Sequence, residues 1–129
     1  MRDFWREDRG GFVDCYTTGR ENIPRHANIF AIMYDFVTEK RARKITRMVL
    51  ENDAITQITT PYFEFFELCA LAKMGKLSAV QKKIESYWGG MVAEGATAFW
   101  EKYEPDMKGA EHYAMYGLPY GKSLCHAWG

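Results

Sequence analysis

The alternation of two kinds of helix constrains the fold of this sequence most. Residues 24–37 are apolar nearly all round, and such a helix is buried on several sides. Residues 39–51 carry one apolar stripe, and basic side chains cover the rest of that helix. With no net positive charge in the chain, a solvated outer face explains those basic residues better than a phosphate-binding patch does. The two segments predict a hairpin of one buried and one amphipathic helix.

The alternation then returns. The segment 61–74 is again apolar on most faces, with Pro61 suited to a first helical turn and Gly75 to a C-cap. The segment 78–92 again has a single stripe. Hairpins over about 24–52 and 61–92 predict an all-α fold of the α/α toroid class, with an inner ring of buried helices and an outer, wet ring. Identity between the hairpins is weak, so the repeat is architectural.

The connections between the predicted helices differ in length. Turns from buried to amphipathic helices are short, whereas the loops 53–60 and 93–122 are long. All long loops and all N-termini of buried helices should therefore lie at one end, where free N–H groups and partial positive charge suit sugar hydroxyls and carboxylates. The length of the 93–122 loop itself suggests function. A further inner helix is predicted to begin at Ser123.

Composition excludes several classes of protein. The chain has 129 residues with 17 basic and 17 acidic side chains, and a nucleic-acid binder would show a basic stripe. No apolar run approaches the roughly 20 residues of a membrane span. The three cysteines form no paired motif, and the three histidines have no metal-ligand spacing. We therefore predict neither a metal site nor a cofactor.

The ends of the sequence suggest a piece of a larger body. Residues 1–9 start abruptly, and SLCHAWG stops where an apolar helix is predicted to begin. A short terminal helix that docks and frays is the alternative explanation. An incomplete barrel would expose apolar edges, and patches of that kind usually find partners, so self-association is expected. The compartment stays open.

The densest cluster of candidate site residues lies in the long loop. Trp100 and Glu101 place an aromatic plane beside a carboxylate, which suits a sugar ring and a proton-transfer step. A loop rich in glycine and aromatic residues is also typical of a structural plug. His126 is either a substrate contact or a helix cap. His26, at the same end of the first buried helix, either lines the cleft or satisfies loop backbone.

Several stretches resemble a known family, namely TPYFEFFELCALAKMGK, SYWGGM, GATAFWEKYEP and MYGLPYGKSLCHAWG. They are similar to the C-terminal part of bacterial α-L-rhamnosidase-like proteins, which are inverting glycoside hydrolases with an (α/α)6 six-hairpin barrel. The resemblance covers about residues 12–129. It implies that this chain is the last part of such a barrel and that the parent hydrolyses terminal deoxy-sugars from plant or microbial glycans.

The resemblance also implies roles for individual residues. Glu101 matches the catalytic general base, Trp100 would shape the sugar pocket, and His126 matches a histidine that contacts substrate. The segment SLCHAW departs from the family's asparagine–histidine pairing, which leaves the sugar open. The family's general acid lies in an earlier segment without a counterpart here, so the isolated chain should be inactive. The alternatives are a non-catalytic scaffold, or a glycan- or protein-binding module, that keeps the fold, and a helical assembly protein.

Overall fold

The computed structural model describes residues 2–18 and 22–127, which divide into two compact units. Unit 1 is formed by the described residues up to Ile58 together with Phe66–Lys76. Unit 2 is formed by Thr59–Phe65 together with the described residues from Leu77 onward. The predicted all-α class is confirmed, because helices make up most of the regular structure of both units.

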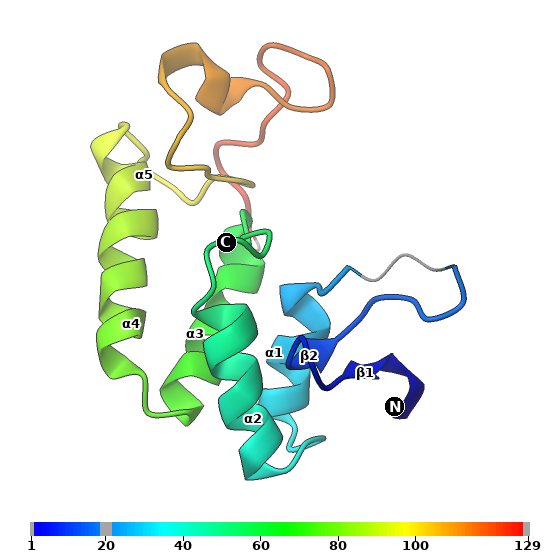
Figure 1. Ribbon diagram of the computed structural model, residues 1–129. Coiled ribbons are helices and arrows are strands. Elements are labelled where there is room, and N and C mark those ends of the chain that lie inside the picture. Colours follow the sequence, from blue (N-terminus) through cyan, green and yellow to red (C-terminus); the bar gives the residue numbers. More distant parts are fainter. Residues whose placement is uncertain (1, 19–21, 128–129) are drawn as a thin grey trace. The chain divides into compact units, whose positions relative to one another are not determined.

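Unit 1 contains a short hairpin and most of three helices (Figure 1). After a 3₁₀ turn, strands β1 (Trp5–Arg6) and β2 (Gly11–Phe12) pair antiparallel, with Trp5 opposite Phe12. The helices are α1 (Arg25–Met33), α2 (Glu39–Ile45) with a π-helical continuation over Thr46–Leu50, and the later turns of α3 (Pro61–Lys73). The helical patterns do not predict the hairpin.

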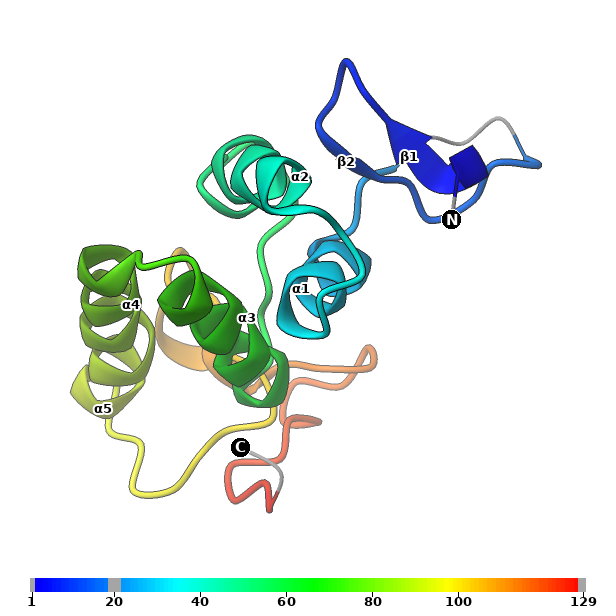
Figure 2. The same ribbon diagram turned by 90° about the horizontal axis from the view of Figure 1, so that it is seen from below.

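Unit 2 begins with the first turn of α3 and continues from α4 (Leu77–Lys83) through a π-helical segment (Ile84–Trp88) into α5 (Gly89–Ala93). Figure 2 shows α4 and α5 as one continuous helical rod. After α5 the chain is irregular apart from a 3₁₀ helix over Gly109–Tyr113. The helix expected over 78–92 is therefore present, and the long loop follows it.

Local chemistry explains where the helices end. Helix α1 stops at Met33, short of the expected 37, because Asp35 adopts a left-handed φ of 55°. Helix α3 ends as predicted at Gly75, whose φ is 73°. There the Lys76 N–H donates to the Leu71 carbonyl at 2.9 Å, the bonding pattern of a Schellman cap.

The further helix expected at Ser123 is absent, because residues 123–127 lie in bends and turns. The Ser123 carbonyl accepts a hydrogen bond from the Glu101 N–H at 2.9 Å, and the His126 N–H donates to the Phe99 carbonyl at 2.8 Å. The Ser123 carbonyl would accept the first hydrogen bond of a helix that starts there, but it is paired with the Glu101 N–H instead. The tertiary contact overrides the apolar pattern that predicts a helix.

The core of unit 1 joins α1, α2 and the hairpin. Fully buried Ile29, Ile45 and Val49 come from the first two helices, and each contributes about 1.5–3 kcal/mol by leaving water. Asn28 binds strand β2 to α1, since its side chain accepts from the Phe12 N–H at 2.8 Å and donates to the Phe12 carbonyl at 3.0 Å. Asn28 thus satisfies the backbone polar groups of Phe12 in strand β2.

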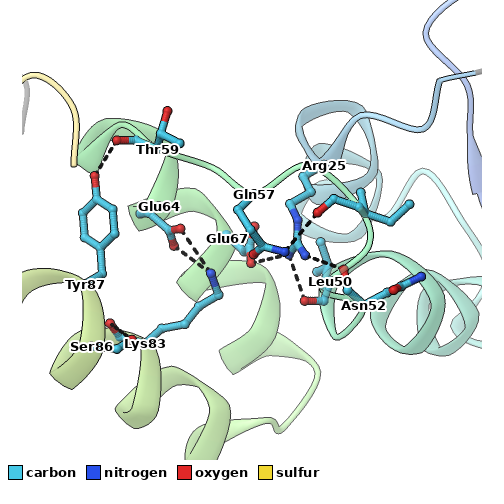
Figure 3. A network of polar contacts seen from close by, with 11 residues as sticks. Arg25, Leu50, Asn52, Gln57, Thr59, Glu64, Glu67, Lys83, Ser86 and Tyr87 are labelled. Atoms are coloured by element: carbon cyan, nitrogen blue, oxygen red, sulfur yellow. Dashed lines mark hydrogen bonds and ion pairs between the residues drawn. The ribbon is translucent and has the colours of Figure 1, made fainter. Parts of the chain in front are cut away.

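A buried ion pair lies within the same unit (Figure 3). Arg25 and Glu67 are 1% and 0% exposed, and Nη1 of Arg25 lies 2.8 Å from Oε1 of Glu67. The guanidinium also donates to the carbonyls of Leu50 and Asn52, each at 2.9 Å. Two of its three hydrogen bonds therefore cap the end of the α2 segment, and the third joins α1 to α3.

Candidate functional site

The long loop of unit 2 is anchored to a buried aromatic cluster. Tyr87, Met91, Trp100 and Tyr103 form this core, and each is at most 5% exposed. The loop leaves α5 through Gly95, whose φ is 92°, with a second Schellman cap in which the Ala96 N–H donates to the Met91 carbonyl at 3.1 Å. These contacts fix the segment immediately before Glu101.

The loop is also tied to the residues that precede α3. The Thr59 carbonyl accepts from the Tyr103 N–H at 2.8 Å and from the Tyr87 hydroxyl at 2.7 Å. Figure 3 shows Tyr87 reaching toward Thr59. The first turn of α3 is held by the ion pair between Glu64 and Lys83, whose Oε1 and Nζ atoms are 3.1 Å apart. Glu64 is thus a structural residue of the helix.

These anchors form a pocket within unit 2 that contains Glu101. The pocket has a volume of about 410 Å³ and is lined by Thr60, Pro61, Tyr62, Phe63, Glu101 and His126. One wall is the N-terminal turn of α3, where the helix dipole places partial positive charge. The opposite residues, Glu101 and His126, come from the two segments that pair along 99–101 and 123–126. The pocket therefore combines an ionisable pair with aromatic side chains.

Both oxygens of Glu101 accept hydrogen bonds. The Tyr116 hydroxyl donates to Oε1 at 2.7 Å, and the Ser123 N–H donates to Oε2 at 3.2 Å. These two donors, in that order, hold the pKa of Glu101 below its ordinary value, and the electrostatic effects of the nearby His126 and Lys122 side chains act in the same direction. Glu101 is consequently a carboxylate at neutral pH. It can accept a proton but has none to donate, which fits a base and not a general acid.

Of the site residues predicted from the sequence, some line the pocket and others do not. Glu101 and His126 line the same pocket. Trp100 does not face it, because its side chain is 3% exposed and packs among Tyr103, His112 and Tyr113. Trp100 was predicted to face the sugar, but the structure places it in the core, where burial of the indole stabilises the loop. A substitution of Trp100 would therefore test the folding of the loop and not a contact with sugar.

His26 lies in unit 1, on the first turn of α1, with an exposed side chain. It is not among the residues that line the Glu101 pocket. Its role as a substrate contact stays a prediction.

Three site residues were not found from the sequence. Tyr62 is 47% exposed on α3 and Phe63 lies next to it, yet an all-round apolar helix pattern assigns both to the core. Tyr116 was counted only as part of an aromatic loop. The signal in the sequence is Gly117 directly after Tyr116, because glycine is typical of tight turns. In the structure both residues have positive φ angles.

Among residues 2–18 and 22–127 there is no group of three or more His, Cys, Asp or Glu side chains placed to hold a metal ion. Within the same ranges, no helix has the combination of length and apolar composition that crossing a bilayer requires.

Lys122 offers a test of the loop's packing. Its side chain is 6% exposed, its ammonium has no hydrogen-bond partner, and Nζ lies 5.9 Å from the centre of the Trp100 ring. Burial lowers the pKa of Lys122. We expect Lys122→Met to raise the free energy of unfolding by about 1 kcal/mol, because the desolvation cost exceeds what a cation–π contact returns. Thermal unfolding beside exposed Lys82→Met checks this, and a fall in Tm specific to Lys122→Met contradicts it.

The fold and the site together define a class of protein. The helices form an all-α piece of a rhamnosidase-like α/α toroid. In a comparison with solved structures, the chain superimposes on a rhamnosidase from Klebsiella oxytoca with rhamnose bound, with a TM-score of 0.81 and 28% sequence identity. The match covers 98% of this chain but only 24% of the rhamnosidase chain. It indicates a glycoside-hydrolase-like origin.

No protein-family model matches the chain, and no curated protein sequence matches it.

Proposed function

We propose that this chain supplies the water-activating half of the active site of an inverting, α-L-rhamnosidase-like glycoside hydrolase that removes terminal deoxy-sugars from glycans. The observation that carries the proposal is the ionised Glu101 carboxylate in a pocket with aromatic walls. The match to a rhamnosidase with rhamnose bound supports it, and the rest of a six-hairpin barrel belongs to the same proposal.

Each pocket residue has a role in that reaction. An inverting glycosidase needs one carboxylate to take a proton from water and a second carboxyl, about 6.5–9.5 Å away, to protonate the leaving oxygen. Glu101 is the base. His126 holds a sugar hydroxyl, because a neutral imidazole both donates and accepts. Tyr62 offers the apolar face against which a pyranose ring packs.

A non-catalytic glycan-binding module is the second candidate. It is favoured by one observation, namely that Glu101 is the only acidic residue among those that line the pocket. Such a module would bind sugar through the same aromatic wall and have no turnover to lose. The expected self-association of the chain also stays a proposal.

Sugar binding by the chain tests what both candidates share. Ligand-observed NMR against L-rhamnose and a small panel of monosaccharides should show selective binding. Tyr62→Ala should weaken it about fivefold, since an aromatic contact contributes roughly 1 kcal/mol. The matched control is Phe65→Ala, which removes a similarly exposed ring from the same helix and unit but not from the pocket. Equal losses in the two variants, or no binding by the folded chain, would count against the proposal.

A further inference from the structure

The hairpin that carries Tyr116 has an unusual turn. Met115 and Leu118 form an antiparallel bridge, with N–H to carbonyl distances of 3.0 and 2.9 Å in the two directions. Both intervening residues have left-handed φ angles, 55° for Tyr116 and 75° for Gly117. This is the type I′ pattern, in which asparagine or glycine is the usual first residue and a bulky side chain is disfavoured.

The fold keeps this hairpin against its neighbours although the turn contains an unfavourable residue. A Cβ atom added to Gly121 would lie 2.3 Å from the Met115 carbonyl oxygen, so the backbone returns close to the hairpin. The Lys122 N–H donates to the Tyr113 carbonyl at 3.1 Å, and the rings of Tyr113 and Tyr120 are stacked with centroids 6.3 Å apart. The strained position is therefore held by packing on both sides.

The side chain at that position does one specific thing. The ring of Tyr116 is 75% exposed, so it adds little to the core. Its hydroxyl donates to Oε1 of Glu101 at 2.7 Å. A residue that disfavours its own turn and buries little surface, yet delivers a hydrogen bond to the candidate base, points to a role in the site.

We propose that Tyr116 is a positioning residue for Glu101: the Met115–Leu118 hairpin delivers its hydroxyl to Oε1 and so orients the carboxylate in the pocket. With the Ser123 N–H on Oε2, each oxygen keeps one lone-pair direction free for a water molecule. This role rests on the proposed function, because orientation matters only if Glu101 handles a proton.

The contact is reciprocal, which makes it measurable. The Tyr116 hydroxyl is the largest cause of the lowered pKa of Glu101, and Glu101 raises the pKa of Tyr116. The other ionisable groups that act on Glu101 are His126 and Lys122, which both lower its pKa. Removing the hydroxyl should raise the pKa of Glu101, and removing the carboxylate should lower the pKa of Tyr116.

Two substitutions separate positioning from structure. Tyr116→Phe deletes only the hydroxyl. Tyr116→Asn also deletes it but places the preferred residue in the type I′ turn, so the hairpin should be no less stable. The control Tyr120→Phe deletes the hydroxyl of a similarly exposed tyrosine, which stacks on Tyr113 and is not among the groups that act on the Glu101 carboxyl.

The experiment is a pH titration of the Glu101 side-chain carboxyl by ¹³C NMR in the full chain. We expect the midpoint to move upward in Tyr116→Phe and Tyr116→Asn and to stay in place in Tyr120→Phe. In Glu101→Gln, the Tyr116 midpoint should move downward. An unchanged Glu101 midpoint in Tyr116→Phe overturns the proposal. The titration is carried out without sugar. Failure of the chain to bind L-rhamnose would therefore contradict the proposed function but leave the measured pKa change of Glu101 unaffected.

Discussion

Replacing Glu101 by glutamine is expected to lower the turnover of terminal-sugar hydrolysis about 10²–10⁴-fold, the usual contribution of one acid–base group. Glutamine keeps the shape of the side chain and can still accept the Tyr116 hydrogen bond, but its amide cannot take a proton from water. Most of the sugar affinity should remain, since the aromatic wall of the pocket is untouched.

The measurement needs a polypeptide in which this chain is joined to the segment that provides the general acid. Release of sugar from an aryl α-L-rhamnoside gives the rate, and ligand-observed NMR gives the binding. Glu94→Gln is the control, because Glu94 is exposed in the same unit and does not line the pocket. Full turnover in Glu101→Gln would remove Glu101 from the role of base and favour a binding module.

Arg25→Met should reduce the free energy of unfolding by about 3–5 kcal/mol, the usual effect of breaking a buried pair. The substitution leaves the Glu67 carboxylate buried without its cation. It also removes the donors from the carbonyls of Leu50 and Asn52. By contrast, the pair between Arg43 and Glu39 is 71% and 75% exposed, so Arg43→Met should change stability by less than about 1 kcal/mol.

Urea unfolding of both variants, followed by circular dichroism, compares the buried and exposed pairs directly. Should Arg25→Met fail to fold, Arg25→Lys provides the measurable case. Lysine keeps the charge near Glu67 but lacks the forked donors, so an intermediate loss is expected. A loss in Arg25→Met no greater than that in Arg43→Met would show that the buried network is not needed.

Much of the fold could be predicted from local chemistry. The helix at 61–74 and the cap at Gly75 follow from the proline, the apolar run and the glycine, and the structure has both. The helix predicted to begin at Ser123 is absent from the structure over the described residues 123–127. Its apolar residues are typical of a helix, but the Ser123 carbonyl, which would accept the first helical bond, is paired with the Glu101 N–H.

The candidate site was predicted in part, for a related reason. Glu101 and His126 were predicted from their residue types and from the family resemblance, and the structure places both in one pocket, while their roles stay predictions. Trp100 was predicted to line the pocket because an indole beside a carboxylate is typical of sugar sites. Its burial depends on ring contacts with Tyr103 and His112, which the sequence pattern does not indicate. The sequence marks Tyr116 only as a residue beside a turn glycine, since its effect on Glu101 depends on a hydrogen bond across the loop.

The sequence alone determined the helical class, the order of buried and amphipathic helices and the identity of the candidate base. Helix periodicity, caps and a reactive residue type are properties of neighbouring residues, so they can be read without long-range contacts. Only the tertiary structure decided which aromatic rings line the pocket and which fill the core. It also decided how the Glu101 carboxylate is held, because the donors from Tyr116 and Ser123 reach its two oxygens through folding of the loop.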